Sequence, residues 1–147
     1  RSPESIGREG EQVKELTMEA LPEHIPAVTD FVNTALDELG CSYRVRMQFA
    51  IAIDELFSNI AYYAYQPKTG LVTVQVEVEN EPPTVILTFL DGGKPFNPLQ
   101  QKDPDTTLPA KDRKIGGLGI FMVKNTMDDI RYEYKDGKNI LSIRKKL

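Results

Sequence analysis

Apolar residues recur at helical spacing in two neighbouring stretches of the first half of the chain. The first stretch runs from Pro22 to Leu39, and Gly40 follows it, where a glycine commonly ends a helix. The second covers residues 43–64 with the same spacing, and Pro67 follows shortly afterwards. The sequence therefore predicts two consecutive helices.

Alternation of apolar and polar side chains predicts strands in the second half. In residues 72–79 each valine is followed by a polar residue, which is typical of a strand with one buried face. A turn at 80–83 and an apolar run at 84–90 complete a hairpin. Asp136-Gly137 is a strong signal for another hairpin turn. The remaining predictions are strands at 11–19, 130–134 and 140–143 and a helix at 120–128.

The order of these elements is strand, two helices, two strands, a long loop, one helix and two strands. It predicts an α+β fold, a two-layer sandwich in which the helices cover one face of a mostly antiparallel sheet. We expect residues 1–10 to form a flexible N-terminus and 11–147 to form a single domain. The loop between Asp91 and Gly119 is interrupted by four prolines, and irregular segments of this length are usually functional or disordered.

Composition and charge narrow the functional classes. The 147 residues are 40% hydrophobic and 27% charged, as in ordinary globular proteins, and the net charge of −4 disfavours nucleic acid or anionic membrane as a partner. No apolar run approaches the roughly 20 residues that span a bilayer, and no signal-peptide pattern is present, so we expect a cytoplasmic protein. With one cysteine, Cys41, and one histidine, His24, neither an internal disulfide nor a Cys/His zinc site can form.

Three clusters of residues could carry chemistry. Glu55 and Asn59 lie four apart on the second helix, so their side chains point the same way. A carboxylate there could accept a proton and an amide oxygen could ligate a hard cation, although two polar residues at a helix edge need no function. Asp91 is either a turn residue or an acceptor for an exocyclic amine such as that of adenine, with Gly93 allowing a flat ring to approach the backbone.

The third cluster is the glycine-rich run Gly116-Gly117-Leu118-Gly119, which precedes the third predicted helix. Glycines at such a position let backbone N–H groups converge at the helix N-terminus, where an anion is favoured. A flexible hinge is the alternative interpretation. The run matches neither the Walker pattern nor the dinucleotide-binding fingerprint.

Together, the order and spacing of the three clusters resemble the N, G1 and G2 boxes of the GHKL (Bergerat-fold) ATPase superfamily. Within it, the chain looks like the bacterial anti-sigma-factor serine kinases. The segment from Phe49 to Asn59 is similar to the N box, Asp91 to Phe96 to the G1 box, and 116–123 to the G2 box.

The resemblance implies ATP and Mg²⁺ as cofactors and a role for each cluster. Glu55 would be the catalytic residue that orients or deprotonates a serine hydroxyl, and Asn59 would ligate Mg²⁺ and help to bind the nucleotide. Asp91 would hold the adenine amine with Gly93 beneath the ring. Residues 94–115 would form an ATP lid. The phosphates would be bound by Gly116, Gly117, Leu118 and Gly119.

The implied function is that of an ATP-dependent anti-sigma factor, a protein-serine kinase. It would phosphorylate an anti-anti-sigma partner of the STAS type and sequester a sigma factor, without direct contact to nucleic acid or membrane, and a homodimer is compatible with the resemblance. Two departures keep open an alternative, a nucleotide-binding module that switches partner binding without phosphoryl transfer. Tyr63 replaces the usual histidine, and Asn139 lies where a threonine is frequent and could substitute for it. A sensor-kinase-like ATPase ranks last, because His24 is a poor phospho-acceptor.

Overall fold

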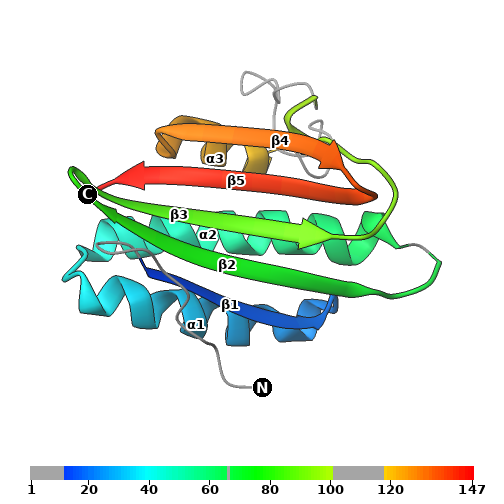
Figure 1. The fold of residues 1–147 in the computed structure, drawn as a ribbon, viewed down its shortest axis with the longest axis horizontal. Coiled ribbons are helices and arrows are strands. Elements are labelled where there is room, and N and C mark those ends of the chain that lie inside the picture. The colour runs from blue at the N-terminus through cyan, green and yellow to red at the C-terminus, as the bar shows by residue number, and fades with distance from the viewer. Residues whose placement is uncertain (1–11, 66, 101–117) are drawn as a thin grey trace, which may run out of the picture.

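The chain alternates between strands and helices in the order that the sequence predicts (Figure 1). The structure is a computed structural model that describes residues 12–65, 67–100 and 118–147. The helices are α1 (Ile25–Glu38), α2 (Tyr43–Asn59) and α3 (Leu118–Thr126), with short turns η1 (Pro22–His24), η2 (Ile60–Ala64) and η3 (Pro98–Gln100). The strands are β1 (Gln12–Glu19), β2 (Leu71–Asn80), β3 (Pro83–Asp91), β4 (Asp129–Lys135) and β5 (Lys138–Lys146).

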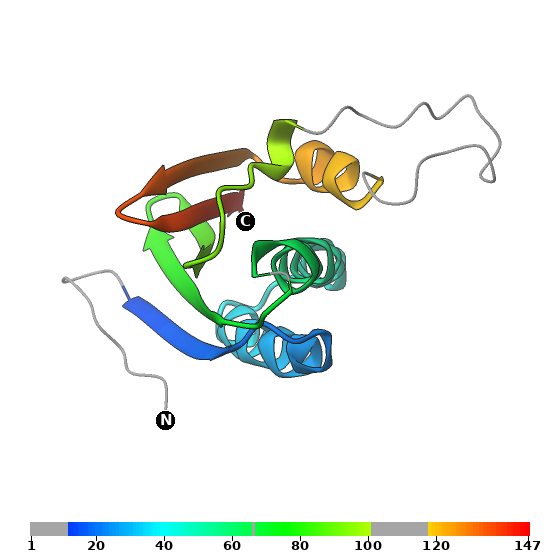
Figure 2. The same cartoon turned by 90° about the vertical axis from the view of Figure 1, so that its right-hand side faces the viewer.

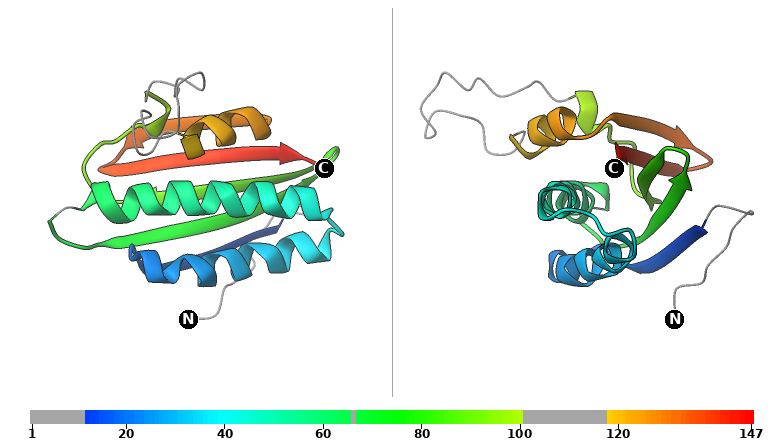
Figure 3. Two further views of the ribbon diagram at one scale, coloured as in Figure 1. Left: turned by 180° about the vertical axis from the view of Figure 1, so that it is seen from behind. Right: turned by 90° about the vertical axis from the view of Figure 1, so that its left-hand side faces the viewer.

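The strands form one sheet in the order β1-β2-β3-β5-β4, and every neighbouring pair is antiparallel. The three helices lie on the same side of this sheet, with α2 crossing its middle (Figures 2 and 3). The predicted α+β class, a two-layer sandwich with an antiparallel sheet, is confirmed. Among the described residues, no helix is long and apolar enough to cross a bilayer.

The core fills the space between the two layers. Three large side chains of α2, Phe49, Ile53 and Phe57, are at most 1% exposed, and they face the buried valines of β2. The helix begins where Ser42 Oγ accepts a hydrogen bond from Val45 N at 3.3 Å, a standard N-terminal cap. The periodicity of α2 and the alternation of β2 therefore bury complementary faces, as the sequence pattern predicts.

The second predicted helix, 43–64, differs from the structure in its last turn. The α-helix ends at Asn59, and residues Ile60–Ala64 form a wider π-helical turn. This turn is attached to the end of β3, because Ala64 O accepts a hydrogen bond from Lys94 N at 2.9 Å. Contacts between segments 30 residues apart select the wider turn, so local periodicity does not reveal it.

Smaller differences concern element ends. The first helix begins at Ile25, preceded by a single turn over Pro22–His24, and β5 extends beyond the predicted 140–143 at both ends. Asp91 is the last residue of β3, since it pairs with both Val72 and Asn139. The expected flexible N-terminus, residues 1–10, lies outside the described residues, as do 101–117 of the predicted loop.

Candidate functional site

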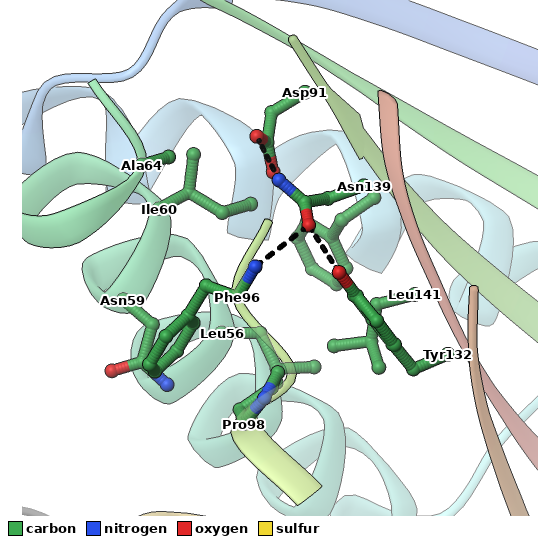
Figure 4. Close-up of a pocket in the computed structure, with 11 residues that line it drawn as sticks. Leu56, Asn59, Ile60, Ala64, Asp91, Phe96, Pro98, Tyr132, Asn139 and Leu141 are labelled. Carbon is green, nitrogen blue, oxygen red and sulfur yellow. Dashed lines mark hydrogen bonds between the residues drawn. The ribbon is translucent and has the colours of Figure 1, made fainter. Parts of the chain in front are cut away.

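A cavity lies between the C-terminal half of α2, the turn η2 and the ends of β3, β4 and β5. Asn59 lines it from the helix and Asp91 lines it from the sheet, opposite each other (Figure 4). Phe96 and Pro98, from the chain that follows β3, lie across it. Two of the three predicted clusters, 32 residues apart in sequence, thus contribute to one cavity.

Asp91 is the buried carboxylate of this cavity, with 5% of its surface exposed. Its Oδ1 accepts two hydrogen bonds of 2.9 Å, from Gly93 N and from Asn139 Nδ2. Burial raises the pKa of Asp91 above its usual value, and the two hydrogen bonds partly oppose this shift. Because both bonds end on Oδ1, the other carboxylate oxygen is the one available to a ligand.

Asn139 connects Asp91 to the chain that leaves β3. Besides Asp91, its Nδ2 donates to Lys94 O at 2.9 Å, and its Oδ1 accepts from Phe96 N at 3.0 Å and from the Tyr132 hydroxyl. Only 5% of Asn139 is exposed, so these four bonds satisfy a side chain that would otherwise be costly to bury. Figure 4 shows the bonds to Asp91, Phe96 and Tyr132. The family resemblance implies only that Asn139 could substitute for a frequent threonine, and nothing in the sequence indicates this network.

Glu55 lies one helical turn before Asn59 and contacts α3. A Cβ at Gly119 would lie 2.0 Å from Glu55 Oε1, so the glycine is required for this approach. Burial raises the pKa of Glu55, the nearby Asn59 amide lowers it, and Asp54 raises it again. The Asn59 Nδ2 group is buried and has no hydrogen-bond partner among the described residues.

The glycine-rich run is described only in part. Gly116 and Gly117 lie outside the described residues, whereas Leu118 is the first residue of α3 and Gly119 the second. Because α3 packs against α2, the start of α3 lies beside Glu55. The structure therefore brings the described end of the third cluster next to the first cluster, and phosphate binding by this run stays a prediction.

Gly93 has a structural explanation that the sequence did not reveal. A Cβ at Gly93 would lie 2.3 Å from the carbonyl oxygen of Ala64, a backbone group that cannot move aside cheaply. The glycine therefore allows the end of β3 to pack against the π-helical turn η2. The expectation that a flat ring lies over Gly93 stays a prediction.

Tyr65 is a second residue that sequence analysis missed. Its hydroxyl accepts a hydrogen bond from Gly92 N at 2.7 Å and donates one to Leu71 O, so it ties η2 to β3 and β2. Tyr63, at the position of the usual histidine, is half exposed and places its ring 5.7 Å from that of Phe96. His24 donates from Nδ1 to Glu19 O and does not line the cavity.

Comparison with known proteins agrees with this geometry. Residues 18–145 match the family model of the histidine kinase-like ATPase domain. The chain belongs to this family. Within the histidine kinase-like ATPases, similar proteins include the serine-protein kinase RsbW of Listeria monocytogenes, which is 25% identical over 131 residues, or 86% of this chain and 82% of the relative. The protein of the same name from Bacillus cereus is 23% identical over 129 residues, with coverages of 86% and 81%.

Proposed function

We propose that the protein is an ATP-dependent protein-serine kinase that acts as an anti-sigma factor. One observation carries this proposal: Asn59 and Asp91, from opposite layers of a histidine kinase-like ATPase fold, line the same cavity. The relatives named serine-protein kinase, whose similarity extends over 86% of the chain, support the choice of a serine as phosphoryl acceptor.

The adenine end of the site is assigned to Asp91. Its free carboxylate oxygen accepts a hydrogen bond from the exocyclic amine of adenine, whereas the carbonyl of guanine would face it with a second acceptor. The cavity volume is about 30 Å³, well below the roughly 300–1,000 Å³ of typical ligand pockets. We therefore expect Phe96 and Pro98 to move outward when a nucleotide enters.

The phosphate end is assigned to Asn59 and the start of α3. The Nδ2 group of Asn59, which is buried and has no partner in the part of the chain that the structure describes, is a donor suited to a phosphate oxygen. The amide oxygen of Asn59 is a suitable ligand for Mg²⁺. Mg²⁺, when bound, neutralises charge on the phosphates. Gly119, together with Gly116, Gly117 and Leu118, supplies backbone N–H groups at the N-terminus of α3, where negative charge is favoured.

Glu55 is assigned as the catalytic residue. Its carboxylate takes the proton of the serine hydroxyl while the serine oxygen bonds to the γ-phosphorus and the bond to the leaving ADP breaks. Burial raises the pKa of Glu55, which makes its carboxylate a stronger base than an exposed one. The contact with Gly119 fixes where this carboxylate lies.

The proposed partners follow from the family resemblance and not from a surface of this structure. The phosphoryl acceptor is a serine on an anti-anti-sigma protein of the STAS type, and the second partner is a sigma factor that the protein sequesters. This makes the protein a regulator of transcription that does not itself contact nucleic acid.

The test is phosphoryl transfer from γ-labelled ATP and Mg²⁺ to STAS-type proteins from the same genome, with phosphoserine identified by mass spectrometry. Wild type should transfer, and Glu55→Ala should lose about 100-fold or more in rate while it still binds ADP. The exposed Asp30→Ala, on α1 and outside the cavity, is the matched control and should transfer like wild type. Full transfer by Glu55→Ala would refute the catalytic assignment.

A second candidate function is a nucleotide-dependent binding module without phosphoryl transfer. The observation that favours it is Tyr63, whose ring packs against Phe96 at the position where the family commonly has a histidine. This module would bind its partner in a nucleotide-dependent way in both wild type and Glu55→Gln, and neither would produce phosphoserine. Transfer by wild type rejects it.

A further inference from the structure

The side chain of Asn139 contacts both Asp91 and the backbone of the segment lying over the cavity. Its Nδ2 donates to Asp91 Oδ1 and to Lys94 O, each at 2.9 Å, and its Oδ1 accepts from Phe96 N at 3.0 Å. The cross-strand pairing of Asp91 with Asn139 places the two side chains together at the ends of β3 and β5.

We propose that Asn139 is a positioning residue that determines base selectivity, because it holds the carboxylate of Asp91 in the orientation that a nucleobase meets. With Oδ1 occupied by Asn139 and by Gly93 N, the carboxylate can neither turn freely nor offer its bound oxygen to the base. Both oxygens of an ionised carboxylate are acceptors, so the effect of Asn139 is one of orientation. Oδ2 is held where the exocyclic amine of adenine can donate to it and where the carbonyl of guanine would be repelled. This inference rests on the proposed nucleotide site.

The bonds of Asn139 to Lys94 and Phe96 affect access to the cavity and not base selectivity. Any nucleotide that enters must displace the segment with Lys94 and Phe96. Loss of these two bonds therefore changes the affinities for ADP and GDP by the same factor. Only the bond to Asp91 distinguishes the two bases. The Tyr132 hydroxyl touches Asn139 Oδ1, on the side of the amide away from the bond with Asp91.

The same contact also controls the ionisation of Asp91. Burial raises the pKa of Asp91 and the hydrogen bond from Asn139 lowers it, so removing that bond should raise the pKa further. Among the described residues, the other titratable groups that face Asp91 are Tyr65, from the end of η2, and Tyr132, from β4. The pKa of each is raised by burial, so both stay neutral throughout the range in which a carboxyl titrates.

The experiment measures ADP and GDP affinities by calorimetry for wild type, Asn139→Ala, Asn139→Thr and Tyr132→Phe. Wild type should prefer ADP, and Asn139→Ala should reduce the ADP-to-GDP affinity ratio about tenfold, the size of one hydrogen bond to a charged group. Asn139→Thr, whose hydroxyl can donate to Asp91, should restore much of the ratio. Tyr132→Phe should change both affinities equally and leave the ratio unaltered.

Ser142→Ala is the matched control. Ser142 lies on the same strand as Asn139 and makes a comparable cross-strand hydrogen bond, to Thr88 at 2.9 Å, which the variant loses. Ser142 does not line the cavity. It should leave the affinity ratio unchanged. An unaltered ratio in Asn139→Ala and Asn139→Thr, with folding verified by circular dichroism, would overturn the proposal.

A titration of Asp91 in the free protein, followed by carbon NMR, distinguishes failure of the positioning role of Asn139 from failure of the proposed function. Asn139→Ala should raise the pKa of Asp91 and Ser142→Ala should not. If the wild type binds neither nucleotide, the proposed function is rejected, and the base selectivity assigned to Asn139 is rejected with it. An unchanged Asp91 pKa in Asn139→Ala rejects the positioning role alone.

Discussion

The contact between Gly119 and Glu55 leads to a prediction that separates catalysis from stability. A methyl group at position 119 would lie 2.0 Å from Glu55 Oε1, whereas ordinary contact begins at 3.4 Å, so the carboxylate must move by about 1.4 Å. The atoms in the way are Glu55 Oε1, Cδ and Cγ, at 2.0, 2.6 and 2.8 Å, and all belong to one flexible side chain, so the shift needs a new Glu55 rotamer but no change in the backbone. We expect Gly119→Ala to fold, with an unfolding free energy within about 1 kcal/mol of wild type.

The displaced carboxylate should nevertheless be costly for the reaction. A misplacement of this size commonly lowers rates about 100-fold, so serine phosphorylation by Gly119→Ala should fall by that factor. ADP affinity should stay within about threefold, since the backbone N–H groups at the start of α3 are kept. Gly92→Ala is the matched control, because its Cβ would meet only the Tyr65 hydroxyl at an ordinary 3.6 Å.

A double-mutant cycle shows whether Gly119 acts through Glu55. If it does, adding Gly119→Ala to Glu55→Ala should lower the residual transfer rate very little, although Gly119→Ala alone lowers it strongly. The assay is single-turnover transfer from γ-labelled ATP. Equal losses in the two backgrounds would refute the reasoning, as would a wild-type rate for Gly119→Ala alone.

Three further predictions concern stability and are read from urea unfolding. Burial raises the pKa of Asp91 in the native state above the ordinary value of 3.8. The free energy of unfolding of the wild type therefore falls as the pH rises from the ordinary pKa through the higher native pKa. Asp91→Asn lacks this titration, so its free energy of unfolding should increase relative to that of the wild type over this pH range and keep that gain at pH 7. A difference between the two proteins that does not change with pH would contradict this. Phe57→Ala, at a fully buried position, should lose about 3–5 kcal/mol, and a loss below 1 kcal/mol would exclude the packing described. Tyr65→Phe should lose about 1–3 kcal/mol because Gly92 N and Leu71 O lose their partner, and an unchanged midpoint would show that water replaces it.

Much of the fold could be predicted because its signals are local. The valines of residues 72–78 alternate with polar residues, and the structure buries Val72, Val74 and Val76 almost completely and Val78 in part. The apolar spacing of α2 likewise predicts a helix that covers the sheet. The π-helical turn Ile60–Ala64 could not be predicted, since its sequence continues the helical pattern and the wider turn depends on contacts with Lys94.

The candidate site, like the fold, could be predicted only in part. The proximity of Asn59 to Asp91 was expected from the family resemblance, and the structure does place both on one cavity. Asn139 was expected only as a substitute for a frequent threonine. Its hydrogen bonds with Asp91 and Tyr132 could not be inferred, because the first depends on a strand register that pairs residues 48 positions apart. Gly93 was assigned to a ligand from the sequence, but a close backbone neighbour already accounts for it.

The most direct test of the central claim is a thermal-shift titration of the purified protein with ATP and GTP, each with and without Mg²⁺. A ligand that binds only the native state raises the melting temperature by mass action. If Asp91 and Asn59 bind the two ends of one nucleotide, ATP should raise the melting temperature, Mg²⁺ should increase that rise, and GTP should have little effect. Equal responses to ATP and GTP, or no response to either, would contradict the account.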